Sequence, residues 1–501
     1  MTVFFVDFVN GLDANNGLGP DASHASNKPW KTIAKLLGVS GMASGDTAYL
    51  SPAGPFREIL SVQMTSPTAE TKIIGDPANA QGFKTSGGVL VEPGDVVWTP
   101  YLTDDTTAPS ATAPVSINGK SFFTFENILF VGGTDTNRNI INAVSPNSTN
   151  ITFRDCAFIG NKTNTVAMSY VGSADIASNW VVDRCFFNSM CASAIRVSLP
   201  TSAVADYDTN FQVTNCSFIG SFTAGVEVIT TGAGAFKGGG VDIFNCSFQG
   251  GGPALYANSA NLSTSIPCTI YNSVIVAGVG IGIRANTSGQ VLEDNNYIAA
   301  STPRTNVTAG GASISNHSHA LMIEFGQAYV MGRSTHRPYF SPTKGSPQLG
   351  RGATAGGPAV DILNRARPSG GESTSYAWGA YERHDTWIRE TTTVRTGSNA
   401  LSCLGPGDGD FHVPVDAAST TVTVYMRYDT NHAATNKPQM KVLNGEEIGV
   451  AEATATMTAA VDTWEQLSLN FTPTAKGIVT IRLISRSAAG NGKAFADDFS
   501  Y

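Results

Sequence analysis

Charged residues are scarce in this sequence, and the cations among them are dispersed. Only 14% of the 501 residues are charged, and the formal net charge is −8 at pH 7. No run of lysine or arginine marks a groove for nucleic acid or a patch for an anionic membrane. We therefore expect no nucleic-acid partner.

Long hydrophobic runs are also missing. The most apolar stretch, residues 274–283, is short and interrupted by glycines, so we expect no insertion into a membrane. Residues 2–7 alternate like a strand and lack the basic region, apolar stretch and cleavage site of a signal peptide. We expect a protein of a virion surface or of the extracellular space, which is reached after removal of a signal or by another route such as lysis.

The cysteines do not indicate a disulfide framework, because there are seven of them, an odd number. Instead, several recur at one position of a local repeat, which predicts buried thiols. These are Cys156, Cys185, Cys216 and Cys246.

What the sequence has in abundance is glycine, with 52 residues, and hydrophobic side chains, which make up 42%. This composition is typical of turn-rich all-β structure. A chain of 501 residues also exceeds the size of a single growing core, so we expect several folding units or one elongated repetitive unit.

An internal repeat of about thirty residues is the most informative feature, because periods of this length indicate solenoids. Each repeat reads as a strand, one polar corner residue and a second strand whose first and third side chains point inward. The corner residues are Asn127, Asp155, Arg184, Asn215, Asn245 and Asn272, separated by 28, 29, 31, 30 and 27 residues. Asparagine and aspartate suit such corners because they tolerate a left-handed backbone, and stacking would align them in a ladder. The same stacking predicts one internal column of the four cysteines and another of Phe130, Phe158, Phe187, Phe218 and Phe248.

A second set of short strands repeats in phase with the first. Its central residues are Asn142, Ser169, Arg196, Glu227, Tyr256 and Arg284. Three strands per coil fit both sets, and coils of this kind are stabilised mainly by their neighbours. A helical solenoid is the alternative, but short alternating strands rich in β-branched and aromatic residues argue against it.

Both ends of the repeat region carry distinctive segments. At the N-terminus, the order is a strand at residues 5–7, a Gly/Asn loop at 11–17, residues 28–33 and a strand at 45–50. This order resembles the opening of pectate-lyase-like right-handed parallel β-helix proteins, and residues 32–37 are expected to form a capping helix. Segments 345–347, 359–368 and 378–382 resemble the closing part of the same superfamily. The resemblance implies a cap and first coil over 1–60 and a right-handed parallel β-helix with its closing segment over 61–383.

From residue 384 to 501 the repeat is replaced by strands with a period of two. Residues 421–426, 464–469 and 478–483 predict half-buried antiparallel strands. The ending at 495–499 is similar to the last strand of jelly-roll carbohydrate-binding modules, so we expect an antiparallel β-sandwich, a jelly roll, over 384–501. The whole chain is therefore predicted to be all-β.

Catalytic residues are sought on the outward ladder of the second strand set. Glycoside hydrolysis needs two carboxyl groups about 5–9.5 Å apart, and only Glu227 stands on this face. A lyase needs a base beside carboxylates, and Arg196 would lie on the coil next to Glu227, where a surface ion pair is the simpler interpretation. Asp206 and Asp208 follow in the next loop and would supplement Glu227 if that loop folded over it, although such residues usually form solvated turns.

Binding residues are indicated weakly. Exposed aromatic platforms suit sugars, and the candidates are Tyr207, Tyr256, Tyr425 and Tyr428. No cofactor is expected except calcium in the C-terminal domain. Its candidate ligands are Asp408 with Asp410 and Asp497 with Asp498. The alternative is that the first pair belongs to a polar turn and the second to the end of a strand. His317 and His319 would present two imidazoles from one strand, but exposed loop histidines are the commoner case.

Together these features predict a non-enzymatic structural or adhesion protein of a phage virion: a fibre, a spike or a capsid decoration. The β-helix would be a rigid shaft, and the sandwich would bind another subunit or a surface glycan. Expected partners are other virion proteins, further copies of the chain in a homotrimer, or cell-surface polysaccharide. The alternative is a polysaccharide lyase or glycoside hydrolase, secreted or carried on a tailspike.

Overall fold

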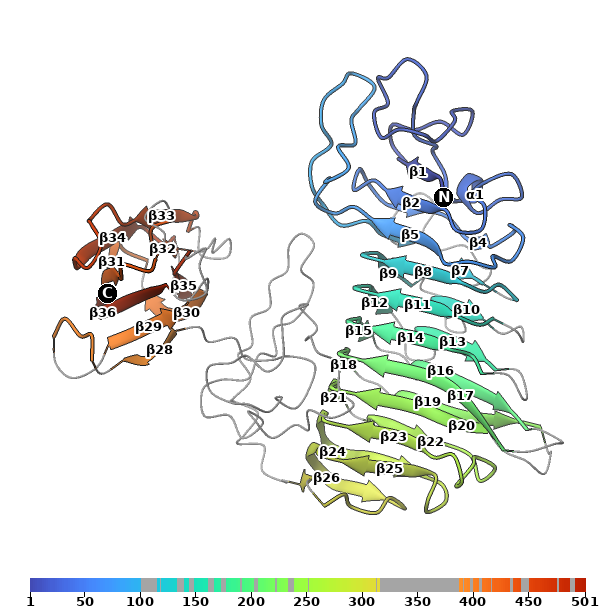
Figure 1. The fold of residues 1–501 in the computed structure, drawn as a ribbon. Helices are drawn as coiled ribbons and strands as arrows, with labels where there is room; N and C mark the ends of the chain where they lie inside the picture. The colour runs from blue at the N-terminus through green and yellow to red at the C-terminus, as the bar shows by residue number, and fades with distance from the viewer. Residues whose placement is uncertain are drawn as a thin grey trace. The chain divides into compact units, whose positions relative to one another are not determined.

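The computed structural model contains two compact units, Met1–Arg383 and His384–Tyr501. Figure 1 shows both, with strands dominating each. The structure describes residues 1–100, 115–117, 119–132, 139–143, 148–160, 166–172, 177–189, 192–201, 206–220, 223–232, 238–250, 252–311, 313–315, 387–390, 392–396, 400–404, 408–415, 417–432, 436–442, 450–474, 477–486 and 492–501. The expected closing segments within 345–382, and His317 and His319, lie outside these residues.

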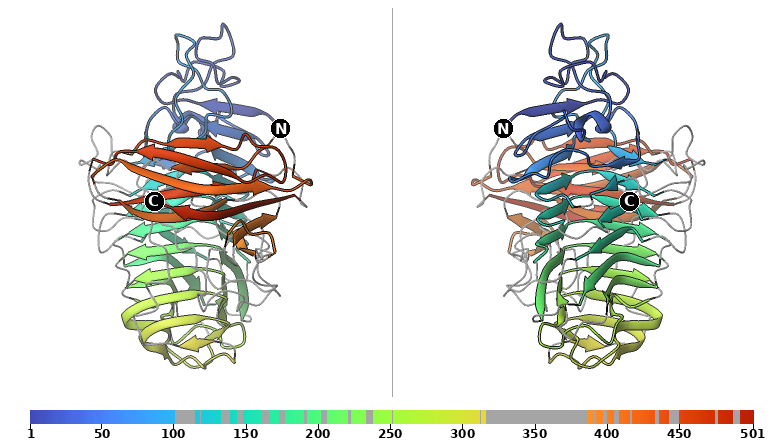
Figure 2. Two further views of the ribbon diagram at one scale, coloured as in Figure 1. Left: turned by 90° about the vertical axis from the view of Figure 1, so that its left-hand side faces the viewer. Right: turned by 90° about the vertical axis from the view of Figure 1, so that its right-hand side faces the viewer.

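The first unit is a parallel β-solenoid whose strands stack along one axis, as Figure 2 shows from two sides. One sheet of ten strands has the order β1 (Val3–Val6), β2 (Thr47–Leu50), β5 (Thr71–Gly75), β8 (Phe123–Glu126), β11 (Ile151–Arg154), β14 (Trp180–Asp183), β17 (Tyr207–Thr214), β20 (Gly238–Phe244), β23 (Cys268–Tyr271) and β25 (Val291–Asp294). We call this the ten-stranded sheet.

The remaining solenoid strands form two further parallel ladders that merge at β24 (Val274–Ala285) and β26 (Tyr297–Thr305). The first ladder contains β3 (Phe56–Arg57), β6 (Val97–Thr99), β9 (Leu129–Val131), β12 (Ala157–Gly160), β15 (Phe186–Ser189), β18 (Ser217–Gly220) and β21 (Ser247–Gly250). The second contains β4 (Leu60–Ser61), β7 (Val115–Ser116), β10 (Ile141–Ala143), β13 (Met168–Val171), β16 (Ser193–Pro200), β19 (Ala224–Thr231) and β22 (Leu255–Ala257). β27 (Ile314–Ser315) pairs with β26. Six coils, from β5–β7 to β20–β22, thus have three strands each, which confirms the predicted parallel β-helix.

The corner residues adopt the left-handed backbone that the repeat predicts. The φ angles lie between 51° and 55° at Asn127, Asp155, Arg184, Asn215, Asn245 and Asn272, and Asn295 extends the series with 53°. A left-handed residue turns the chain sharply out of the ten-stranded sheet, and Asn and Asp tolerate this conformation. Arg184 has no such preference, but its guanidinium bonds both oxygens of Asp155 on the preceding coil.

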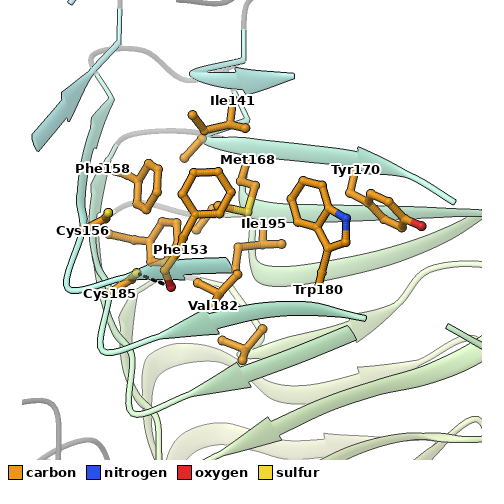
Figure 3. Close-up of a cluster of buried hydrophobic side chains, with 14 of the residues drawn as sticks. Ile141, Phe153, Cys156, Phe158, Met168, Tyr170, Trp180, Val182, Cys185 and Ile195 are labelled. Atoms are coloured by element: carbon orange, nitrogen blue, oxygen red, sulfur yellow. Dashed lines mark hydrogen bonds between the residues drawn. The ribbon is translucent and has the colours of Figure 1, made fainter. Parts of the chain in front are cut away.

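The predicted internal columns are present, and Figure 3 shows part of both. Successive phenylalanine rings stack almost in parallel, with centroids 5.3 Å apart for Phe130 and Phe158 and 4.7 Å for Phe158 and Phe187. The series continues at 4.7 Å to Phe218 and 4.4 Å to Phe248. Such rings contribute large buried apolar areas, so this column is the main stabilising element of the core.

The cysteine column satisfies backbone groups at the corner. The thiol of Cys185 donates to the Phe153 carbonyl oxygen on the preceding coil, at 3.5 Å, as drawn in Figure 3. The Cys185 amide in turn donates to Sγ of Cys216 on the next coil, at 3.4 Å. The six described cysteines are free and buried, and burial raises the pKa of the Cys156 and Cys216 thiols. They are structural thiols, as the sequence predicts.

The N-terminal end is covered by a loop region and one short helix, α1 (Ile33–Leu36), within the segment predicted to form a cap. Thr32 caps the helix by accepting a hydrogen bond from the Lys35 amide. The carboxylate of Glu58 accepts from the next two free amides, those of Ile33 and Ala34, at 2.8 Å each. None of the helices among the described residues is long and apolar enough to cross a membrane.

The second unit consists of two antiparallel sheets with their own hydrophobic core. One has the order β28 (Trp387–Glu390), β29 (Ala400–Leu404), β36 (Lys493–Ser500), β31 (Thr420–Tyr428) and β34 (Glu465–Phe471). The other has the order β30 (Asp408–Val415), β35 (Gly477–Ile484), β32 (Gln439–Val442) and β33 (Ala453–Thr456). The expectation of an all-β chain that ends in an antiparallel sandwich is confirmed.

Candidate functional site

The outward ladder of the second strand set forms one continuous column on the solenoid surface. In-register pairing aligns its members, which are Ser116, Asn142, Ser169, Arg196, Glu227, Tyr256, Arg284 and Thr305. Neighbouring strands lie about 4.8 Å apart, so each side chain contacts those directly above and below. We call this row the polar column.

Glu227 is the centre of this column, and its carboxylate is fully engaged. Oε2 accepts hydrogen bonds from Arg196 Nε at 2.8 Å and from Ser193 Oγ at 2.7 Å. Oε1 accepts from Asn258 Nδ2 on the following coil, also at 2.7 Å. The whole residue is only 7% exposed, so these three donors replace the water that a free carboxylate would hold.

These contacts set the protonation state of the carboxyl group. Burial alone would raise the pKa of Glu227, but the hydrogen bonds from Asn258 and Ser193 and the positive charge of Arg196 outweigh it and lower that pKa. Glu227 is therefore ionised at neutral pH. It is poorly suited to general acid catalysis, which requires a proton, and its lone pairs are already directed at protein donors.

The column offers no second carboxylate with which Glu227 could form a hydrolytic pair. Among the eight described residues of the polar column, Glu227 is the one acid. A glycoside hydrolase mechanism needs two carboxyl groups on opposite sides of the scissile bond. The arrangement can thus hold a polar ligand by hydrogen bonds, but it lacks the pair for this hydrolysis.

The lower part of the column presents a cation over an aromatic ring. The Arg284 guanidinium lies 4.5 Å from the centroid of Tyr256, and the Tyr256 hydroxyl is 3.4 Å from Asn286 Oδ1. Tyr256 is only 9% exposed, so its ring supports the arginine and does not form an open platform.

The structure does not bring Asp206 and Asp208 into contact with Glu227. Asp206 accepts a hydrogen bond from Ser263 Oγ, and Asp208 accepts one from the Asn210 amide, both at 2.7 Å. Asp208 also packs so closely on Gly240 that a Cβ there would lie 1.8 Å from its Oδ1. Both carboxylates are thus hydrogen-bonded near the start of β17, Asp206 to Ser263 ahead of β23 and Asp208 to an amide of its own strand.

Three of the four candidate sugar-binding tyrosines are buried. The Tyr207 hydroxyl donates to the Pro200 carbonyl oxygen at 2.6 Å, and the Tyr428 hydroxyl donates to the Ala459 carbonyl oxygen at 3.1 Å. Tyr425 is partly exposed, but the Arg395 guanidinium lies 3.5 Å above its ring centroid. In this conformation, none of the candidates presents an uncovered ring face.

The two candidate calcium pairs lie on different sheets of the sandwich. Asp408 and Asp410 belong to β30, whereas Asp497 and Asp498 belong to β36. Asp497 accepts from the backbone amides of Arg395 and Thr396, and Asp498 pairs with the side chains of the same two residues. Asp497 and Asp498 thus fasten residues 395–396 to β36, and no cluster of three potential ligands occurs among the described residues.

Two donors to Glu227 were not assigned from the sequence. Ser193 starts β16 and is buried, and Asn258 follows β22 one coil later. The spacing of one coil would identify them, because Ser193 lies 34 residues before Glu227 and Asn258 lies 31 residues after it.

The fold and the polar column define a parallel β-helix protein with a C-terminal β-sandwich. No protein-family model and no curated protein matches the sequence. Among solved structures, a family 16 carbohydrate-binding module matches 23% of the chain and 84% of its own length, with 13% identity and a TM-score of 0.19. An arabinose-bound MgGH51 α-L-arabinofuranosidase matches 23% of the chain and 23% of its own length, with 19% identity and a TM-score of 0.18.

A third solved structure is the enzymatically active domain of a tailspike protein of bacteriophage CBA120. The match covers 90% of this chain and 63% of that one, with 10% identity and a TM-score of 0.18. TM-scores below 0.5 carry no argument, so the assignment of function depends on this chain's own residues.

Proposed function

We propose that the chain is a non-enzymatic structural and adhesion protein of a phage virion, a fibre, spike or capsid decoration. Its β-helix serves as a rigid shaft, and its sandwich binds a surface glycan or another subunit. The observation that carries the proposal is the state of Glu227: the one acid of the polar column is ionised and bonded to Arg196, Ser193 and Asn258.

The stiffness of the shaft follows from its interior. The stacked phenylalanine column and the thiol-to-backbone contacts join each coil to the next without a break from Phe130 to Phe248. Because each coil is stabilised by its neighbours, such an array resists bending and local opening.

A surface for glycan is offered by the outer face of the five-stranded sheet of the sandwich. Uncharged polar side chains face one another across β31 and β34 in the pairs Thr421 with Asn470, Thr423 with Ser468 and Tyr425 with Gln466. Val422, Val424, Leu467 and Leu469 alternate with them and point into the core. Hydroxyl and amide groups both donate and accept, as binding to a neutral polyhydroxyl chain requires.

The direct test is incubation of the purified chain with a panel of capsular and plant polysaccharides. We expect retention of at least one polysaccharide without release of fragments. Replacing Gln466 and Asn470 by alanine should weaken that retention, whereas Thr454→Ala on the opposite sheet should not. Release of fragments by the wild type, lost in Glu227→Gln and kept in Glu126→Gln, would reject the proposal in favour of a lyase or hydrolase.

A further inference from the structure

The last described coil of the solenoid contains a charged residue where every preceding coil is apolar. The inward position of the ten-stranded sheet is occupied by Phe125, Phe153, Val182, Val213, Ile243 and Ile270 in successive strands, and then by Glu293 in β25. The side chain of Glu293 is completely buried. A buried carboxylate at an apolar position costs several kcal/mol unless it is paired and hydrogen-bonded, so its presence needs a reason.

Glu293 binds the segment that follows β26. Its Oε1 accepts from Arg304 Nε at 2.6 Å and from the Gly310 amide at 2.7 Å. Its Oε2 accepts from Ser313 Oγ at 2.6 Å and from Asn296 Nδ2 at 2.9 Å. Four donors from β26, from the corner and from residues 310–313 therefore converge on one carboxylate.

The chain at residues 306–311, which together with Ser313 we call the strap, is packed directly against β25. A Cβ on Gly310 would lie 2.2 Å from the Glu293 carbonyl oxygen, so the close approach requires glycine. Val307 packs against the hydrophobic core, and Asn306 Nδ2 donates to the Ala285 carbonyl oxygen at 3.1 Å. The strap is thus held against β25, and two of its residues, Gly310 and Ser313, are hydrogen-bonded to the Glu293 carboxylate.

β25 is the terminal strand of the ten-stranded sheet among the described strands. An edge strand is a template for pairing with another chain, and an inward-pointing charge is one of the devices that prevent such pairing. We propose that the Glu293–Arg304 pair is a latch at the last described coil: it holds the strap against β25 and keeps that coil from stacking on a second copy of this chain.

The proposed role of the latch, control of association with other copies of the chain, can be measured separately from its effect on thermal stability. Replacing a buried ion pair by apolar residues of similar size is often neutral or stabilising. The double variant Glu293→Leu with Arg304→Met should therefore lose little through the pair itself. It also leaves the Gly310 amide, the Ser313 hydroxyl and the Asn296 side-chain amide without their acceptor, so its thermal unfolding temperature should fall by a few degrees below that of the full-length wild type. In sedimentation velocity it should nevertheless form species larger than the wild type, in increments of the wild-type mass.

A matched control removes another ion pair from the same sheet. Arg154 Nη1 and Glu126 Oε1 are 3.0 Å apart on the outer face, in the middle of the solenoid. The double variant Glu126→Leu with Arg154→Met should sediment like the wild type. Adding Leu292→Lys to the latch variant should reverse its association, because Leu292 is 49% exposed on β25 and the substitution places a charge on this strand.

Three results would overturn the proposal. The latch variant would sediment like the wild type, or it would form larger species only at temperatures at which it has unfolded, which would make the association a consequence of lost stability. In the third result, the control variant Glu126→Leu with Arg154→Met would associate as strongly as the latch variant. The association would then be a general effect of lost charge.

Discussion

The cysteine column makes a prediction that distinguishes hydrogen bonding from packing. Cys216 Sγ accepts from the Cys185 amide at 3.4 Å and donates to the Val182 carbonyl oxygen at 3.4 Å. Cys216→Val puts an apolar side chain, larger by about one methyl group, in the place of the thiol and removes both functions, which leaves a buried amide without an acceptor. An unsatisfied buried group of this kind costs about 1–3 kcal/mol.

Cys216→Ser is the matched variant, because a serine already accepts the equivalent hydrogen bond two coils further along. Ser273 Oγ accepts from the Cys246 amide at 3.2 Å in the equivalent position. We expect the serine variant to lie within about 1 kcal/mol of the wild type, since the hydroxyl preserves the acceptor.

Hydrogen exchange at the Cys185 amide measures the effect locally. A loss of about 1–3 kcal/mol corresponds to exchange roughly 5- to 150-fold faster in the valine variant if exchange reports the opening equilibrium. The amide of Trp180, which lies earlier on β14, serves as an internal reference within the same coil. Equal protection at Cys185 in both variants, or a serine variant weaker than valine, would refute the hydrogen-bond interpretation.

Three further outcomes follow from the coil geometry. Phe187→Ala should lower the free energy of unfolding, measured by chemical denaturation, by about 3–5 kcal/mol. The rings of Phe158 and Phe218 lie 4.7 Å from Phe187 on either side and would leave a cavity that cannot collapse, so the smaller change Phe187→Leu should cost less. Asn245 has a φ of 51°, and its buried side-chain amide has no hydrogen-bond partner among the described residues. Asn245→Gly should therefore have a thermal unfolding temperature equal to or above that of the wild type, because glycine adopts this φ without strain. Asn245→Ala should lower the free energy of unfolding by about 1–2 kcal/mol, because alanine is strained at a positive φ. Because the pKa of Glu227 is lowered in the folded protein, its ionised form contributes stability that is fully present above the ordinary glutamate pKa and is lost as the pH falls through the folded-state pKa. When the free energy of unfolding is measured as a function of decreasing pH, it should decline less steeply for Glu227→Gln than for the wild type. Parallel curves would contradict this.

Most of the solenoid is predictable from the sequence, because its repeats carry local chemistry. A left-handed corner needs a residue such as asparagine, and the same residue type recurs at Asn215, Asn245 and Asn272 with the spacing of one coil. The inward columns follow from the corner, since alternation fixes which side chains point into the core. The pairing of Arg196 with Glu227 follows in turn from the register.

The environment of the candidate site is less predictable, because it depends on contacts between coils that alternation does not encode. Ser193 starts its strand and is buried, although a serine after a loop suggests an exposed turn. Tyr207 likewise follows a loop, yet its hydroxyl turns back to the Pro200 carbonyl oxygen. Strand β24 has 12 residues and joins two strands that the sequence predicts separately. This long strand forms only if the glycines within residues 278–282 keep an extended backbone.

The cysteine repeat and the latch are two parts of one hydrogen-bonded series. Along the corner, each amide donates to a side chain of the next coil: Cys216 to Sγ of Cys246, Cys246 to Oγ of Ser273, and Ser273 to Oδ1 of Asn296. The acceptor changes from sulfur to hydroxyl to amide oxygen, so the interior becomes more polar coil by coil. Asn296 then donates from its backbone to Ser313 Oγ and from its side chain to Glu293. A further apolar coil would have to cover these polar groups without partners for them, and among the described strands the apolar series that ends at Ile270 gives way to Glu293 at this coil.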